Sequence, residues 1–267
     1  MTSAITPLTR AATDGLTRLM DGPPGPDRLN AALRHLAKWR AAVLENTLVA
    51  RSGSTVLGGP FVGMAYPVRA SEGSRIARLL GCYEASLAPM LETVIARAYP
   101  FVIDVGAAEG YYATGLARRM PATTVLARDS DPAARALCQT MAEANGVSAR
   151  VHVGGAMEHA DFDRCTAQYT FVLCDIEGGE RDLLDPACAP GLCHADILVE
   201  VHEGRHPGLL ATLTDRFAPT HRITRIDRHL APQALPEWAE ALSDLDRLLL
   251  LWEWRATPTP WLWMERR

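Results

Sequence analysis

The spacing of hydrophobic positions changes its period near residue 98. Before that point, helices are expected at residues 6–20, about 27–50 and 71–98, separated by a DGPPGPD break and by the glycine-rich stretch RSGSTVLGGPFVGMAY. Thr6 and Pro7 suit the cap and first turn of the first helix. In the second helix, one face carries apolar residues at helical spacing: Leu29, Leu33, Leu36, Val43, Leu44 and Leu48. We therefore predict a mainly helical N-terminal region over residues 1–98.

After residue 98, short apolar runs alternate with helical patterns. The predicted strands are PFVIDV, TTVLARD, ARVHV, YTFVLC, ADILVEV, HRITRI and PWLWME. Helices are expected at YYATGLARRM, at DPAARALCQTMAEANG with Asp131 as its cap, at the short GGERDLLD and at PGLLATLTDRF. Strands that alternate with helices indicate an α/β fold, in which a mostly parallel sheet is covered on both faces. This second domain is expected over residues 99–267.

Composition and charge restrict the class of protein only mildly. The 267 residues are 48% hydrophobic, which is enough for a full core, and the formal net charge is −4. Nucleic acid and anionic membranes are not expected as partners, because either normally requires a basic stripe. No apolar run approaches the roughly 20 residues of a membrane span, so none is predicted. The N-terminus lacks the charged segment followed by an apolar segment that is typical of a signal peptide. The six cysteines form no CxxC pair, which indicates reduced thiols and a cytoplasmic protein.

The stretch VIDVGAAEGYY predicts a ligand-binding loop between a strand and a helix. Asp104 lies at the end of the strand, and Gly106 and Gly110 bracket a tight turn. Such a turn at a helix N-terminus suits a nucleotide-like ligand at the carboxyl edge of a parallel sheet. The loop lacks the third glycine of G-x-G-x-x-G, so a dinucleotide is disfavoured. An ordinary tight turn is the alternative.

Asp129 strengthens the prediction of a ribose-containing ligand. It ends the next predicted strand, about 20 residues beyond the glycine loop, where an acidic residue can bind ribose hydroxyls. The alternative role of helix cap is already filled by Asp131. Two carboxylates around the loop suit a ligand that carries both a ribose and a positive charge.

These stretches together resemble the class I S-adenosylmethionine-dependent methyltransferases. VIDVGAAEGYY, LARDSDP, NGV before a strand, and FVLCDIEGGE carry the resemblance, and DIEGGE followed by ILVEVH resembles the FkbM-type branch. The similarity covers about residues 99–204. It implies a Rossmann-like sheet of seven strands whose last strand is antiparallel. Ala108 is a departure, because many members carry glycine there.

The resemblance also implies a role for each residue of the cofactor site. The loop Gly106, Ala107, Ala108 and Gly110 would approach the amino-acid end of S-adenosylmethionine, and Asp104 would hold its ammonium group. Asp129 would bind the ribose, Ala156 and Met157 would flank the adenine, and Asp175 would lie beside the sulfonium.

The acidic DIEGGE stretch at residues 175–180 raises the question of catalysis. Asp175 and Glu177 follow the fourth strand, and Glu200 and His202 follow the fifth, so all four are expected at one edge of the sheet. In one interpretation, His202 or an acid is a general base. In the other, the four residues bind a divalent metal, with magnesium or manganese favoured by oxygen and iron, manganese or zinc by histidine. Glu177 and Glu180 could instead cap the short helix.

Five further residues are predicted to line a substrate pocket. Trp252, Glu253 and Arg255 precede the last strand and are expected in a wall of the pocket, beside Trp254, although a plain hydrophobic edge is the alternative. Tyr83 and Glu84 precede the first strand and could close over the cofactor, although Tyr83 could equally belong to the core. The helical N-terminal region is expected to act as a lid or as the surface of a homodimer.

The function that the resemblance implies is transfer of a methyl group from S-adenosylmethionine to a small molecule. A hydroxyl oxygen on a natural-product or sugar-like acceptor of secondary metabolism is expected, with carbon or nitrogen as alternatives. A metal-assisted version of the same reaction remains open. So does a scaffold that binds the cofactor without catalysis, whereas the loop disfavours a nicotinamide oxidoreductase.

Overall fold

A computed structural model describes residues 6–71, 73–255, 257 and 259–267. The chain divides into two compact units. The smaller unit contains the chain up to Gly53 together with residues 235–252, and the larger unit contains residues 54–234 and 253–267. The predicted boundary at residue 98 therefore lies inside the larger unit. Residues 1–5 and 72 of the predicted N-terminal region lie outside the described residues.

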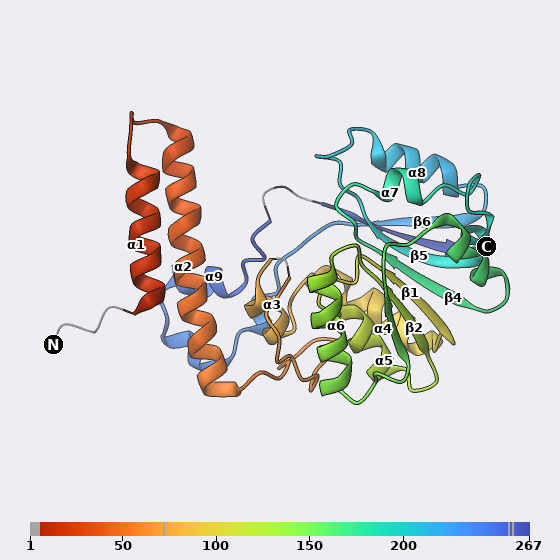
Figure 1. Cartoon of the computed structure of the whole chain (residues 1–267), viewed down its shortest axis with the longest axis horizontal. Helices are drawn as coiled ribbons and strands as arrows, with labels where there is room; N and C mark the ends of the chain where they lie inside the picture. Colours follow the sequence, from red (N-terminus) through yellow and green to blue (C-terminus); the bar gives the residue numbers. More distant parts are fainter. Residues whose placement is uncertain (1–5, 72, 256, 258) are drawn as a thin grey trace. The chain divides into compact units, whose positions relative to one another are not determined.

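The smaller unit is built on two long helices that pack side by side (Figure 1). They are α1 (Pro7–Met20) and α2 (Pro26–Ser52), and α2 also packs against α9 (Asp244–Leu250). Thr6 caps α1 as predicted, since its side chain accepts a hydrogen bond from the backbone N–H of Thr9. Arg40 of α2 holds Asp246 of α9 through two hydrogen bonds of 2.6 and 2.7 Å. This bidentate pair connects segments that are about 200 residues apart in sequence.

The larger unit contains a seven-stranded sheet in the order β3-β2-β1-β4-β5-β7-β6. Its strands are β1 (Phe101–Val105), β2 (Thr124–Arg128), β3 (Val151–Gly154), β4 (Thr170–Cys174), β5 (Ala195–Glu200), β6 (His221–Ile226) and β7 (Trp261–Arg266). Strands β1 to β5 pair in parallel, whereas β7 is antiparallel to both β5 and β6. The predicted fold, with seven strands and an antiparallel last strand, is confirmed.

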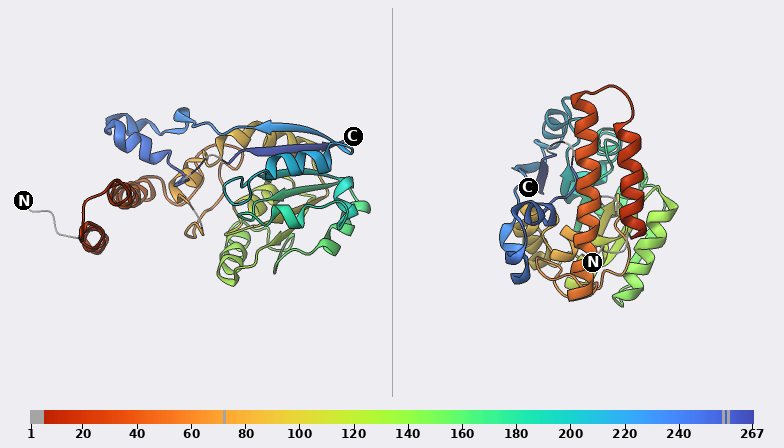
Figure 2. Two further views of the ribbon diagram at one scale, coloured as in Figure 1. Left: turned by 90° about the horizontal axis from the view of Figure 1, so that it is seen from above. Right: turned by 90° about the vertical axis from the view of Figure 1, so that its left-hand side faces the viewer.

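Helices cover both faces of this sheet (Figures 1 and 2). One face carries α4 (Ala88–Arg97), α5 (Tyr111–Arg119) and α6 (Pro132–Ala144), and the other carries α7 (Glu180–Leu183) and α8 (Leu209–Phe217). Asp131 caps α6 by accepting a hydrogen bond of 2.8 Å from the N–H of Ala133. The larger unit also contains the six-residue α-helix α3 (Arg75–Leu80). Short 3₁₀ helices are found at η1 (Ala85–Leu87), η2 (His159–Thr166), η3 (Pro190–His194), η4 (Pro232–Ala234) and η5 (Glu237–Ala241).

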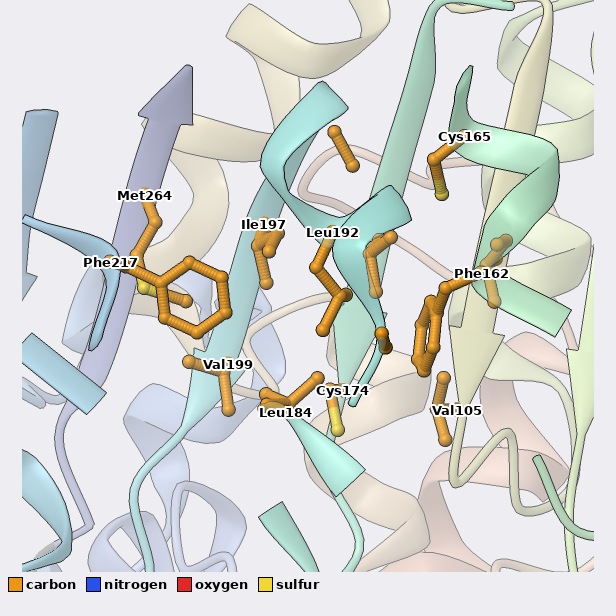
Figure 3. Packing of buried hydrophobic residues seen from close by; sticks show 14 of the residues in the cluster. Val105, Phe162, Cys165, Cys174, Leu184, Leu192, Ile197, Val199, Phe217 and Met264 are labelled. Carbon is orange, nitrogen blue, oxygen red and sulfur yellow. The ribbon is translucent and has the colours of Figure 1, made fainter. Parts of the chain in front are cut away.

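A continuous apolar layer lies between the sheet and the helices on the face that carries α8 (Figure 3). Alternate residues of β1, namely Phe101, Ile103 and Val105, point into this layer beside Phe162 of η2. Because successive side chains of a strand point to opposite faces, Asp104 points to the other face, toward α5 and α6. The strand therefore buries a carboxylate on one side while it contributes to the core on the other.

The predicted helix over residues 71–98 is interrupted in the structure. Helix α3 ends at Gly81, whose φ of +75° is left-handed, and Glu84 also has a positive φ of +48°. A Cβ atom on Gly81 would lie 1.9 Å from the carbonyl oxygen of Gly58, so only glycine fits this turn. The segment Arg75–Arg97 is long and apolar enough to resemble a membrane span by composition. The break divides it into two short helices and a 3₁₀ turn.

Candidate active site

The glycine loop has the close backbone contacts that its two glycines predict. Gly106 has a φ of +81°, and a Cβ atom there would lie 1.7 Å from the carbonyl oxygen of Asp175. Gly110 has a φ of +86°, and its Cβ atom would lie 2.6 Å from the sulfur of Cys138. Ala108 also adopts a left-handed φ of +47°, at a conformational cost of about 1–2 kcal/mol. The loop is therefore a strained turn that packs directly against the end of β4.

Asp129 holds this loop in place from the end of β2. One carboxylate oxygen accepts a hydrogen bond of 2.8 Å from the N–H of Ala108, and the other accepts one of 2.8 Å from the N–H of Asp131. Each oxygen keeps a second lone pair for a ligand. The sequence analysis missed this structural role, and the role as a ribose ligand stays a prediction.

Asp104 is a buried carboxylate whose oxygens lack hydrogen-bond partners among the described residues. Burial raises the pKa of Asp104 to about 7, and the backbone of Ala113 only partly opposes this shift. A nearby cation stabilises the charged form of a carboxylate in such surroundings. This donor set fits the ammonium end of S-adenosylmethionine, although the side chain lies behind the glycine loop.

A cavity of about 600 Å³ opens at the carboxyl ends of β1, β2 and β4, a volume suited to a nucleoside-sized ligand. Seven residues of the predicted cofactor site line it: Gly106, Ala107, Ala108, Asp129, Ala156, Met157 and Asp175. Asp104 and Gly110 are not among its lining residues. Tyr83, predicted for the substrate pocket, and Glu177, predicted for catalysis, also line this cavity.

The cavity has an aromatic and cationic wall that the sequence analysis did not predict. Tyr111 and Tyr112 open α5, and Arg78 of α3 lies over the ring of Tyr83 at 3.9 Å from its centroid. Arg78 also forms an ion pair of 2.9 Å with Glu109 of the glycine loop. The signal for Tyr111 and Tyr112 was their place directly after the loop, whereas no local pattern pointed to Arg78.

His202 is the centre of the predicted catalytic group. Its imidazole is 7% exposed, and its Nδ1 lies 2.8 Å from Oε1 of Glu180. Its Nε2 lies 3.5 Å from Glu200 and 3.6 Å from both Asp175 and Glu177. The structure therefore brings together all four predicted catalytic residues.

The sequence analysis undervalued Glu180, which it considered only as a residue that could cap the short helix, because Glu180 contacts His202. The side chain is fully buried, and its Oε1 also accepts a hydrogen bond of 3.1 Å from the N–H of Ile176. Burial acts to raise the pKa of Glu180, but the hydrogen bond and charge of His202, together with backbone hydrogen bonds from Glu180 and Ile176, outweigh burial, and the pKa is lowered. Burial alone would lower the pKa of His202, whereas Glu180 and Glu200 raise it. The spacing of Glu180 from Asp175 did not by itself predict this contact with His202.

A buried ion cluster adjoins these residues. Arg255 donates hydrogen bonds to Glu84, Glu200 and Glu253, and Glu200 also accepts one from the hydroxyl of Thr259. Burial and the charge of Glu200 raise the pKa of Glu84 to about 8, although Arg255 opposes the shift. Burial and the same charge also raise the pKa of Asp175 well above its usual value. Arg255, together with Arg228, which also pairs with Glu253, therefore faces an excess of carboxylates.

Of the residues predicted for the substrate pocket, Glu84, Glu253 and Arg255 meet in this cluster. Arg255 also lines a second cavity of about 320 Å³, together with His202 and Glu177. Because Glu177 lines both cavities, they share one wall. Trp252 differs from these residues, since it belongs to the smaller unit.

No protein-family model and no curated protein matches the chain in sequence. Solved structures with a similar trace include an O-methyltransferase from Bacillus cereus with S-adenosylhomocysteine, at 12% identity and a TM-score of 0.46 over 66% of this chain and 78% of that one. A methyltransferase from Podospora anserina with S-adenosylhomocysteine has 13% identity and a TM-score of 0.45 over 71% and 79%. The O-methyltransferase TomG from Streptomyces achromogenes has 12% identity and a TM-score of 0.44 over 67% of this chain and 80% of that one. Values this low carry no argument about activity, which must come from the site itself.

Proposed function

We propose that the protein is an enzyme that transfers a methyl group from S-adenosylmethionine to a small molecule. The observation that carries the proposal is the arrangement around the 600 Å³ cavity, where a strained glycine loop and two carboxylates, Asp104 and Asp129, meet at one edge of the sheet. The loop brings backbone to the ligand, and the buried Asp104 favours a positive charge. The bound cofactor supplies an electrophilic methyl group on its sulfonium.

We propose a hydroxyl oxygen of a natural-product or sugar-like molecule as the acceptor. The second cavity, beside His202 and Arg255, is the proposed binding place for this molecule, because it shares the wall at Glu177 with the cofactor cavity. The protein's main task is to align the acceptor oxygen with the methyl group. The oxygen must also lose its proton, which His202 can assist either as a base or as the ligand of a cation.

We propose further that the helical N-terminal region acts as a lid or as the contact surface of a homodimer, and that the enzyme is cytoplasmic. The exposed leucines of α2 and the reduced state of the cysteines support these two points, respectively. All six cysteines are free thiols.

The test of the proposed function is the melting temperature with and without saturating S-adenosylhomocysteine. A ligand at about 100 times its dissociation constant adds about 2.7 kcal/mol of stability, which raises the melting temperature by roughly 5–10 °C for a domain of this size. We expect Asp129→Ala to abolish the shift. Asp131→Ala is the matched control, because it removes a neighbouring carboxylate that caps α6 and does not line the cavity. This variant should keep the shift in melting temperature.

Absence of a shift with both S-adenosylhomocysteine and S-adenosylmethionine would contradict the proposal. The same melting-temperature measurement with NAD tests the oxidoreductase alternative. An oxidoreductase would be stabilised by NAD, whereas the proposed methyltransferase should show no shift with it.

A further inference from the structure

The surroundings of His202 are unusual because three carboxylates face one ring nitrogen without forming a hydrogen bond to it. Oxygens of Asp175, Glu177 and Glu200 lie 3.5–3.6 Å from Nε2. A protonated Nε2 would normally draw one carboxylate to about 2.7–2.9 Å, as the other ring nitrogen does with Glu180. Nearly equal, longer distances to three oxygens leave space for an ion among them.

The second ring nitrogen is fixed in the way that metal-binding histidines require. Nδ1 lies 2.8 Å from Oε1 of Glu180, and an ionised carboxylate can only accept a hydrogen bond, so this nitrogen carries the proton. The lone pair of a neutral His202 then lies on Nε2, which points toward the three carboxylates. A buried carboxylate behind a ligand histidine is the usual outer partner in metal sites.

The oxygen ligands are held with similar care. Thr259 and Arg255 bind Oε1 of Glu200, so Oε2 remains free to face His202. Oδ1 of Asp175 is the atom closest to Nε2, and it is buried without a hydrogen-bond partner among the described residues. Glu177 has a left-handed φ of +55°, which is a strained conformation for a residue with a side chain.

We propose that His202, Asp175 and Glu200 bind one Mn²⁺ ion, with Glu177 as an exposed fourth ligand. Ligand atoms of the first three lie within 4.8 Å of one another, a distance that ligands about 2.1 Å from a common ion can meet after small movements. Carboxylates suit magnesium, calcium and manganese, while imidazole suits transition metals, and manganese is the transition metal among the ions that carboxylates prefer.

The ion would lie where the two cavities share the wall at Glu177. A cation there lowers the pKa of an acceptor hydroxyl, so no protein base is needed. This catalytic use rests on the proposed methyl transfer, whereas binding of the ion itself does not.

The experiment is a titration of the folded, metal-free protein with Mn²⁺ alone, in which electron paramagnetic resonance measures the free ion. We expect one saturable site per chain. His202→Gln should weaken binding at least 100-fold, because it removes a ligand. Glu180→Gln should weaken binding by about 10- to 100-fold, because Glu180 only orients His202.

Glu92→Gln is the matched control, since it neutralises a half-exposed carboxylate that pairs with Arg119 outside the cluster. It should bind Mn²⁺ like the unaltered protein. The melting temperature with S-adenosylhomocysteine checks that each variant is folded, and Glu180→Gln should keep that shift. This readout distinguishes loss of the ion from loss of the fold.

The inference fails if the unaltered protein binds no Mn²⁺ at concentrations up to about a millimolar, the weak end of protein metal sites. It also fails if His202→Gln and Glu180→Gln bind Mn²⁺ as the control does. If the protein binds S-adenosylhomocysteine but fails to bind Mn²⁺, this inference is overturned and the proposed function stands. If it binds Mn²⁺ but fails to bind S-adenosylhomocysteine, the ion site is supported and the proposed function is overturned.

Discussion

Single residues of this protein carry much of the strain and charge of the candidate site. Gly106 must be glycine because of the carbonyl oxygen of Asp175, and the carboxylate oxygens of Asp104 are buried without a hydrogen-bond partner in the part of the chain that the structure describes. Neither feature is optimal for stability, and both lie where the cofactor is proposed to bind. Strain and unpaired charge of this kind concentrate at functional sites.

At Gly106, we predict that Gly106→Ala destabilises the fold by about 2–4 kcal/mol. The added Cβ atom would lie 1.7 Å from the carbonyl oxygen of Asp175, so either the glycine loop or the backbone at Asp175 must move. Urea unfolding measures the change. Gly155→Ala is the matched control, because nothing lies within 4 Å of its added Cβ atom, and it should change stability by less than about 1 kcal/mol.

At Asp104, the raised pKa predicts how stability depends on pH. The native state keeps this proton up to about pH 7, whereas the unfolded chain releases it near pH 4. The stabilisation is therefore complete below about pH 4 and is lost as the pH rises through 7. We predict that Asp104→Asn raises stability at pH 8, by at most about 4 kcal/mol, while it weakens binding of S-adenosylhomocysteine.

Thermal unfolding at pH 5 and pH 8 tests this, because the gain from Asp104→Asn should shrink at the lower pH. Asp131→Asn is the control, since asparagine caps a helix as well as aspartate does. Equal stability of Asp104→Asn and the unaltered protein at both values would contradict a buried, unpaired carboxylate.

The sequence predicted the positions of the proposed catalytic residues better than it predicted their partners. Asp175, Glu177, Glu200 and His202 were expected together because carboxyl ends of parallel strands share an edge. The bond between Glu180 and His202 depends on how the chain turns at Gly178 and Gly179, which spacing alone does not specify. The convergence of Glu84 and Glu253 on Arg255 joins segments about 170 residues apart, and no local pattern encodes it.

At the scale of elements, the strands and the helices of the sheet followed their periodicity closely. The misjudged segment was residues 71–98, where apolar residues at helical spacing continued through a turn. Gly81 ends α3 because Gly58 passes too closely for any side chain, a tertiary contact that periodicity does not contain. Helix α9 was not predicted, because its seven residues are too few to show a clear period.

Helix α2 has an unpaired apolar stripe within the smaller unit. Leu29, Leu33 and Leu36 are 61%, 67% and 39% exposed and share one face of the helix. We predict that this stripe meets its copy in the proposed homodimer, since a two-fold interface pairs identical surfaces. Leu33→Glu should shift the protein to monomer in analytical ultracentrifugation.

Leu230→Glu is the control for that experiment, because Leu230 is an exposed leucine of the larger unit and should leave the mass unchanged. A monomer for the unaltered protein at micromolar concentration would count against the homodimer.

At the scale of the whole molecule, every residue that lines either cavity belongs to the larger unit. We therefore predict that a chain without residues 1–53 still binds S-adenosylhomocysteine, with a dissociation constant within about threefold of the original. Isothermal titration calorimetry measures the constant. A much larger loss of affinity would instead favour the lid that the N-terminal region was proposed to form.

The smaller unit is discontinuous along the chain, and this affects how the protein is made. A ribosome releases α1 and α2 first, but their partner α9 and the pair of Arg40 with Asp246 come only after more than 180 further residues. Strand β7, which lies between β5 and β6, is likewise synthesised after both of its neighbours. Neither unit can be completed before its late segment, α9 in the smaller unit and β7 in the larger, has left the ribosome. In the interval the apolar sides of the nascent helices are exposed, and chaperones that hold hydrophobic segments would have their longest opportunity on this chain.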